Sequence, residues 1–208
     1  MTLFKCGSEK ADREAVLSAA EEVAAGKLVV YPTETVYGIG ADIYNDVAVK
    51  NVYMVKKRPF DMPLSVAVSD KKMMEKVAVL DENADILIKE FLPGPLTIII
   101  KKQADISDIV TSSSQKVGIR IPDHPIAQDL IKHTGPIIAT SANLHSKFDA
   151  VNINMAMGDL GDRISTYIDA GSSPLGEPST IVWLMDGQVE IIRQGAISAD
   201  RIREVIKC

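Results

Sequence analysis

Cysteine is scarce in this chain, and long hydrophobic runs are missing. Only two cysteines occur in 208 residues, Cys6 and Cys208, and their spacing is not that of a metal site. They are typical of free thiols in a reducing compartment, not of a disulfide framework. No apolar run approaches the roughly 20 residues that span a bilayer, and residues 1–25 carry acids and bases throughout, unlike a secretory signal. We therefore expect a cytoplasmic protein without a membrane segment.

An excess of positive charge is also missing. The chain has 23 basic and 28 acidic residues, a net charge of −5, so any nucleotide or RNA would have to bind at a local cluster of cations. The three histidines, His124, His133 and His145, show no metal-ligand spacing. No serine stands in a motif with a catalytic base. These absences favour chemistry by positioning and charge neutralisation.

Strand and helix patterns interleave along the chain, and no linker or repeat divides it. We therefore predict one domain over residues 1–208. Apolar periodicity predicts helices over 8–25, 45–58, 84–91, 124–133 and from 198 onward, and strands over 28–31, 64–68, 96–100, 117–121, 136–139, 166–169, 180–184 and 189–192. Asp186-Gly187 predicts a hairpin turn between the last two strands. The pattern is that of an α/β (α+β) protein with a mixed parallel and antiparallel sheet.

The segment Tyr31-Pro32-Thr33-Glu34-Thr35-Val36-Tyr37-Gly38-Ile39-Gly40 leaves a predicted strand through hydroxyl-bearing residues and two glycines. Glycine permits close approach of the backbone to a ligand. The segment is neither a phosphate-binding Walker loop nor a dinucleotide fingerprint, because no Gly-Lys-Ser/Thr follows and Ile43 replaces the third glycine. The residues alone fit a structural turn and a ligand loop equally well.

Basic residues gather at Lys56-Lys57-Arg58, at the end of a predicted helix. Cations complement the helix dipole there by about 0.3–1 kcal/mol each, and they could equally bind phosphate or carboxylate oxygens. Arg120 alternates with apolar residues on a predicted buried strand. It must either pair with an internal acid or face an anion from the strand end.

Small polar residues follow other predicted strands. Thr140-Ser141-Ala142-Asn143 comes directly after an apolar strand, where open α/β sheets place ligands, although helix capping is the simpler role. Ser179 opens one strand of the predicted hairpin and Arg193 closes the other. We expect these two residues near the same end of the strand pair.

Taken in order, seven segments resemble the YrdC/TsaC family of threonylcarbamoyl-AMP synthases, in its short single-domain form. The segments are residues 31–40 given above, Lys-Lys-Arg-Pro (56–59), Pro-Gly-Pro-Leu-Thr (93–97), Gly-Ile-Arg-Ile-Pro-Asp-His-Pro (118–125), Ser-Ala-Asn (141–143), Ser-Thr-Ile-Val (179–182) and Ile-Arg-Gln-Gly (192–195). The resemblance implies an open, twisted mixed sheet with helices on both faces and a concave basic groove.

It also implies the reaction and its partners. Threonine and bicarbonate would form a carbamate that attacks the α-phosphate of ATP and expels pyrophosphate, with Mg²⁺ on the phosphates and no direct protein ligand. A separate threonylcarbamoyl transferase would then use the product to make the t6A modification at adenosine 37 of tRNA. A basic groove would also accommodate tRNA or double-stranded RNA.

The resemblance assigns roles to eight residues by motif position. Lys56 and Arg58 would neutralise the ATP phosphates and act as catalytic residues. Threonine would be bound by Thr35, Arg120 and Ser179, and the nucleotide by Lys56, Arg58, Ser141, Asn143 and Arg193.

The chain also departs from the family pattern. Residues 144–151 lack the usual Ser-Gly and Ser-Pro-Thr, and Asp149 would repel phosphate unless a metal intervenes. Ala67 replaces a histidine found in some members, and Trp183 stands where aspartate is common. The altered segment supports an alternative, a non-catalytic relative that binds RNA. A carbamoyl-transfer module, like that in hydrogenase-maturation proteins, is a further alternative.

Overall fold

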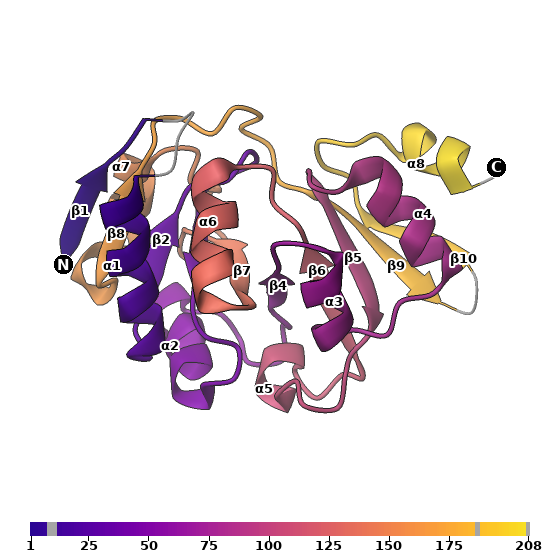
Figure 1. Cartoon of the computed structure of the whole chain (residues 1–208), viewed down its shortest axis with the longest axis horizontal. Coiled ribbons are helices and arrows are strands. Elements are labelled where there is room, and N and C mark those ends of the chain that lie inside the picture. Colours follow the sequence, from indigo (N-terminus) through magenta and orange to yellow (C-terminus); the bar gives the residue numbers. More distant parts are fainter. Residues whose placement is uncertain (8–11, 186–187, 207–208) are drawn as a thin grey trace.

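The computed structural model describes residues 1–7, 12–185 and 188–206. Its strands form a ten-stranded mixed sheet in the order β1-β8-β2-β3-β7-β4-β6-β5-β9-β10 (Figure 1). The strands are β1 Thr2–Lys5, β2 Val29–Tyr31, β3 Gly38–Gly40, β4 Ser65–Ala67, β5 Leu96–Lys101, β6 Lys116–Arg120, β7 Ile137–Ser141, β8 Thr166–Asp169, β9 Thr180–Met185 and β10 Gln188–Arg193. Strands β4 and β6 pair parallel, whereas β5 and β6 pair antiparallel. The predicted mixed sheet is confirmed.

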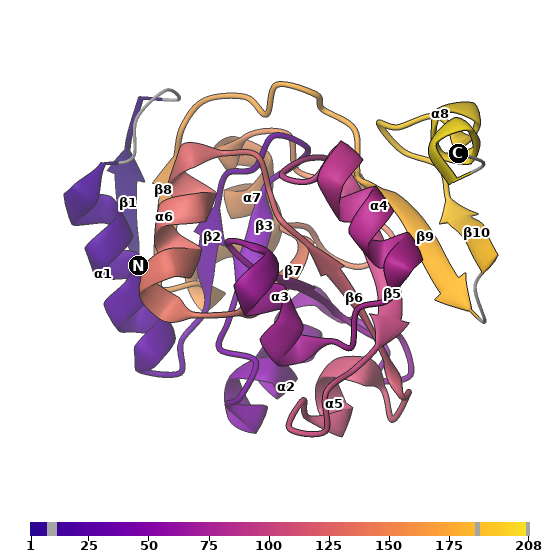
Figure 2. The same ribbon diagram turned by 45° about the vertical axis from the view of Figure 1, so that its right-hand side comes forward.

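Helices cover both faces of this sheet. They are α1 Arg13–Ala24, α2 Asp46–Lys56, α3 Lys71–Val77, α4 Glu82–Phe91, α5 Asp108–Thr111, α6 Pro125–Thr134, α7 Ile153–Leu160 and α8 Ala199–Ile206. On β2, Val29 belongs to the hydrophobic cluster that contains α1 and α6, whereas Val30 belongs to the cluster that contains α2 and α7. Successive strand residues face opposite sides, so each face has its own helices. Figures 1 and 2 show α1 and α6 side by side, with α7 behind the sheet.

Local sequence explains where the helix before the basic run begins and ends. The Asn45 side chain accepts hydrogen bonds from the backbone N–H groups of Val47 and Ala48, both at 3.1 Å, and so caps α2. The helix ends at Lys56, and Lys57 adopts a left-handed conformation with φ 52°. The predicted cap and the predicted end before Pro59 are both confirmed. Arg58 therefore lies beyond the helix, on the chain that leads to β4.

The sequence patterns did not predict every strand and helix. Strands β1 and β3 and helices α3, α5 and α7 were not predicted. The most important is β3, because it lies inside the segment that looked like a turn or loop and pairs antiparallel with both β2 and β7. A Cβ on Gly38 would lie 3.1 Å from Cζ of Tyr31. Glycine fits here because the Tyr31 ring from the neighbouring strand packs against this position, not because the chain turns.

The predicted C-terminal hairpin is present as an antiparallel pair of strands, β9 and β10, with Met185 opposite Gln188. The turn residues Asp186 and Gly187 lie outside the described residues, as do residues 8–11 of the first predicted helix. No helix in the described ranges is long and apolar enough to cross a membrane. The single-domain boundary of 1–208 stays a prediction.

Candidate active-site cleft

A cleft of about 520 Å³ lies over one face of the sheet. Its floor is built from alternate residues of four adjacent strands: Ser65 on β4, Lys116, Gly118 and Arg120 on β6, Thr97 and Ile99 on β5, and Ile181 and Trp183 on β9. The intervening residues Val66, Ile119, Ile98 and Val182 belong to the hydrophobic core. The two-residue period of a strand therefore separates cleft from core. A Cβ on Gly118 would lie 2.9 Å from Ser65 Oγ, so glycine keeps this floor open.

Arg120 forms a buried ion pair at the polar end of the cleft. Its Nη2 donates to Glu34 Oε1 at 2.5 Å, and its Nη1 donates to Thr35 Oγ1 at 2.9 Å. The two charged side chains are only 10% and 9% exposed. Arg120 also lines the cleft, so it pairs with an internal acid and faces the ligand space at once. No role was predicted for Glu34. The sequence feature that could have indicated one is the position of this acid between two threonines, just beyond a buried strand.

The turn after β2 is held together by its own hydroxyl groups. Thr33 Oγ1 donates to the carbonyl of Val36 at 2.6 Å and lies 2.9 Å from Thr35 Oγ1. Tyr37 anchors the end of the turn, because its hydroxyl donates to the Gly171 carbonyl at 2.6 Å. Burial raises the pKa of Tyr37 to about 12, which keeps this phenol neutral. Thr33 lines the cleft, whereas Thr35 is fully buried behind Arg120.

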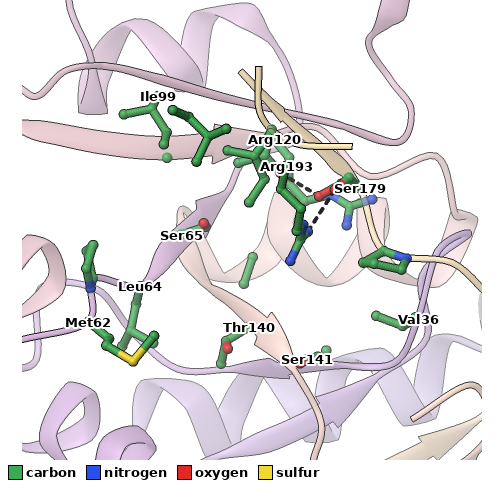
Figure 3. Close-up of a pocket in the computed structure, with 18 of the residues that line it drawn as sticks. Val36, Met62, Leu64, Ser65, Ile99, Arg120, Thr140, Ser141, Ser179 and Arg193 are labelled. Atoms are coloured by element: carbon green, nitrogen blue, oxygen red, sulfur yellow. Dashed lines mark hydrogen bonds between the residues drawn. The ribbon is translucent and has the colours of Figure 1, made fainter. Parts of the chain in front are cut away.

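Ser179 and Arg193 meet at the same end, as the hairpin predicted. Arg193 Nη2 donates to the Ser179 carbonyl at 2.7 Å, and the Ser179 hydroxyl lies 2.8 Å from that of Thr97. Figure 3 shows Arg120, Arg193 and Ser179 close together in the cavity, with Thr140 and Ser141 on its opposite side in that view. Burial lowers the pKa of Arg193; nearby Asp149 opposes this shift and Arg120 reinforces it. Arg193 is therefore a partly desolvated cation, suited to an anionic ligand.

The residues of the basic run 56–58 do not all face the cleft: Arg58 lines it, whereas Lys56 is buried behind its wall. Arg58 lines the cleft and donates from Nε to the Met62 carbonyl at 3.1 Å and from Nη2 to the Pro63 carbonyl at 3.0 Å. Lys56 instead is 2% exposed and donates to the carbonyls of Ser141 and Asn143, the latter at 2.8 Å. Burial, reinforced by Arg58, lowers the pKa of Lys56 to about 8.

The structure therefore separates the eight predicted site residues into two groups. Those that line the cleft are Arg58, Arg120, Ser141, Ser179 and Arg193, and those that lie behind its wall are Thr35, Lys56 and Asn143. The Asn143 amide donates to the carbonyls of Leu144 and Lys147, both at 2.9 Å. Lys56 and Asn143 thus hold the turn after β7 in place. Their assigned contacts with a nucleotide stay predictions.

Lys116 and Trp183 also line the cleft, although the sequence analysis gave neither residue a role in ligand binding. Lys116 lies on β6 on the same face as Arg120, and its Nζ is 3.7 Å from the centre of the Trp183 ring. Their signal was the alternation of strand residues, by which Lys116, Gly118 and Arg120 share one face. Trp183 and Ile99 therefore add apolar surface beside Lys116 at this end of the cleft.

The charges that line the cleft are mostly positive. Four cations, Arg58, Lys116, Arg120 and Arg193, face two carboxylates, Asp61 and Asp149. This excess confirms the predicted basic groove and suits a ligand with several negative charges. Within the described residues, no group of three or more histidine, cysteine, aspartate or glutamate side chains could hold a metal ion.

The altered segment 144–151 contributes one residue, Asp149, to the lining of the cleft. Its beginning is fixed by Asp159, which accepts a hydrogen bond from the Leu144 N–H at 3.1 Å and pairs with Lys147 at 2.8 Å. Asp149, near its end, lines the cleft, whereas the neighbouring Phe148 is 91% exposed. The segment is therefore folded against the body of the protein while it places a carboxylate beside the cations.

The fold and the cleft together define an α/β protein whose cleft is lined by more cations than carboxylates. The family model for Sua5, YciO and YrdC, described as "Telomere recombination", matches residues 21–195. The chain belongs to this family, as the seven segments predicted.

Named relatives agree with this assignment. A putative threonylcarbamoyl-AMP synthase of Methanocaldococcus jannaschii is 39% identical over 88% of this chain and 86% of the relative. The threonylcarbamoyl-AMP synthase of Bacillus subtilis is 39% identical over 92% of this chain. The solved structure of P. abyssi Sua5 complexed with L-threonine has a TM-score of 0.95 and 33% identity over 99% of this chain. The chain spans 56% of the B. subtilis protein and 61% of the P. abyssi chain.

Proposed function

We propose that this chain is an L-threonylcarbamoyladenylate synthase, which makes threonylcarbamoyl-AMP and pyrophosphate from ATP, bicarbonate and L-threonine. The observation that carries the proposal is the cleft, in which Arg120 and Ser179 are within reach of the same ligand space as Arg58 and Arg193. A guanidinium matches the planar oxygens of both a carboxylate and a phosphate. The names of the relatives and the threonine in the P. abyssi structure support this choice of substrates.

The reaction would proceed in two bond-forming steps. Threonine bound as a zwitterion first loses a proton from its ammonium group to solvent. The neutral amine then adds to the carbon of bicarbonate, and loss of water leaves a carbamate. A carbamate oxygen then attacks the α-phosphorus of ATP, and the bond to pyrophosphate breaks. Arg120 would hold the threonine carboxylate, while Arg58, Arg193 and Lys116 would offset the negative charge of the triphosphate in the transition state.

We further propose Mg²⁺ as the cofactor, carried on the ATP phosphates. This ion takes oxygen ligands and commonly keeps several waters. Asp149 and the Ser141 hydroxyl supply oxygen donors on the cleft wall, so the residues fit an ion that phosphate mainly holds. Bound there, Mg²⁺ would supply charge neutralisation. Asp149 would then be compatible with phosphate in the same cleft.

The remaining partners follow from the chemistry of the product and from the family. A mixed anhydride of a carbamate and AMP is a reactive acylating agent, so a transferase would consume it, and the resemblance to the family implies the one that modifies adenosine 37 of tRNA. We propose a cytoplasmic location, where this RNA and ATP are available. Direct binding of tRNA or double-stranded RNA belongs to the alternative, in which the cations lining the cleft contact phosphates without catalysis.

Pyrophosphate release tests the proposal. Purified protein is incubated with ATP, Mg²⁺ and bicarbonate, with and without L-threonine, and the nucleotide product is identified by mass spectrometry. We expect release that depends on both threonine and bicarbonate, with threonylcarbamoyl-AMP as the product. A folded protein that binds ATP but releases no pyrophosphate under these conditions would instead favour the RNA-binding alternative.

A further inference from the structure

The ion pair between Glu34 and Arg120 is incomplete. Only one oxygen and one terminal nitrogen are joined, Glu34 Oε1 and Arg120 Nη2. Glu34 Oε2 and Arg120 Nε are both buried and have no hydrogen-bond partner among the described residues. Buried donors and acceptors are nearly always paired, because an unpaired group has lost its hydrogen bonds to water without gaining a replacement. The polar end of the cleft therefore carries one unused acceptor on Glu34 and one unused donor on Arg120.

The surroundings fix Glu34 on the side away from the ligand space. Its carbonyl accepts a hydrogen bond from the Leu175 N–H at 2.9 Å. Arg120 lines the cleft and Glu34 does not, so the Glu34 carboxylate lies behind the guanidinium with which it pairs. Thr35 holds Nη1 of the same guanidinium. Two adjacent residues of one turn thus determine how Arg120 presents its remaining N–H groups to the cleft.

The charge of this pair decides which carboxylates can bind. A simple carboxylate on Arg120 would place a second negative charge next to one guanidinium that Glu34 already neutralises. In a poorly solvated site, two carboxylates repel strongly. A zwitterion avoids this penalty, because its own ammonium group compensates Glu34. The pair as a whole is therefore matched to a ligand that carries both charges.

We propose that Glu34 is a positioning and specificity-determining residue, which acts through Arg120 to make this end of the cleft accept a zwitterionic α-amino acid and reject the corresponding carboxylate without an amino group. The inference rests on the proposed function, since it takes an amino acid as the ligand of Arg120. It assigns a role to a side chain that lies behind the cleft wall.

Calorimetric binding of two ligands tests the inference. L-Threonine and 3-hydroxybutanoate differ only by the α-amino group. We expect the wild-type protein to bind threonine about 100-fold more tightly or better, and Glu34→Gln to reduce that ratio by about tenfold or more, because the amide keeps a hydrogen bond to Arg120 but leaves its charge uncompensated. Glu90→Gln is the matched control, since Glu90 pairs with the exposed Arg201; it should leave the ratio unchanged.

Two results would overturn the inference. One is a ratio that Glu34→Gln leaves unchanged or increases. The other is equal binding of both ligands by the wild-type protein, and it decides the question even if the variant does not fold. In the pyrophosphate assay, Glu34→Gln should raise KM for threonine about tenfold and leave KM for ATP within about twofold, a split that general loss of structure would not produce.

The same assay separates this inference from the proposed function. If the wild-type protein releases pyrophosphate but Glu34→Gln does not change the ligand ratio, the role of Glu34 is wrong and the synthase stands. If no pyrophosphate is released but the ratio behaves as expected, the synthase is wrong and the selection of a zwitterion stands.

Discussion

Lys56 and Arg120 are the two most deeply buried cations around the cleft, and they are stabilised in different ways. Arg120 pairs with the carboxylate of Glu34, whereas Lys56 is surrounded by the carbonyl groups of Ser141 and Asn143. Carbonyl dipoles supply hydrogen bonds but no net charge, and desolvation therefore lowers the pKa of Lys56 to about 8. A carboxylate supplies both. Lys56 thus supports the backbone through hydrogen bonds to carbonyl groups, whereas Arg120, which lines the cleft, also has a carboxylate that compensates its charge.

Arg120→Ala should have the largest effect on this comparison. It removes the carboxylate ligand and leaves Glu34 buried without its partner, which typically destabilises a fold by about 3–5 kcal/mol. We expect threonine-dependent pyrophosphate release to fall at least about 100-fold and the melting temperature to drop. Arg201→Ala, which removes an exposed guanidinium, is the control. Retention of threonine use by Arg120→Ala would refute the assignment of Arg120 to the carboxylate.

Lys56→Met should mainly reduce stability. The substitution keeps the length of the side chain but leaves the Asn143 carbonyl without its side-chain donor, whereas the Ser141 carbonyl still accepts from the Asn143 N–H at 3.0 Å. Urea denaturation should show a free energy of unfolding lower by roughly 2 kcal/mol, the cost of one buried acceptor left unpaired. Lys57→Met is the matched control, because Lys57 is exposed one residue later; equal effects of the two substitutions would contradict the support role of Lys56.

Arg58→Ala tests whether Arg58, which lines the cleft, has a different role from Lys56, which lies behind the cleft wall in the same basic run. Arg58 lines the cleft, two residues after Lys56. Its loss should reduce kcat/KM for ATP by about 30-fold, or about 2 kcal/mol, because a charge-assisted contact with phosphate is removed. KM for threonine and the free energy of unfolding should change little. A larger effect on threonine than on ATP would show that the cation serves the other substrate.

The pH dependence of stability gives the smallest expected effect. The pKa of Lys56 is about 8 in the folded protein, below its ordinary value of 10.5, so between these values the unfolded chain binds more protons than the folded one. Stability contributed by this group therefore rises with pH above about 8. We expect the difference in unfolding free energy between the wild type and Lys56→Met to widen by roughly 1 kcal/mol from pH 7.5 to 9, measured by urea denaturation. A constant difference would show that the ammonium is better solvated than its burial indicates.

Prediction from sequence succeeded where the signal was local. Asn45 caps α2, the hairpin joins Ser179 to Arg193, and the period of two on β6 placed Arg120 on a buried strand. Each depends on residues a few positions apart or on one turn. The strand Gly38–Gly40 was missed because two glycines in three residues carry no strand preference, and its pairing with β2 and β7 is fixed by neighbours from distant segments.

The amino-acid sequence by itself determined the family, the mixed sheet and three of the cations that line the cleft, Arg58, Arg120 and Arg193, because motif order and strand periodicity can be read along the chain. Only the tertiary structure decided that Glu34 neutralises Arg120 across 86 positions and that Lys56 turns away from the cleft toward the carbonyls of Ser141 and Asn143. The physical reason is that burial and charge compensation depend on which groups share a low-dielectric space. That proximity is set by the folding of β2, β6 and β7 into one sheet.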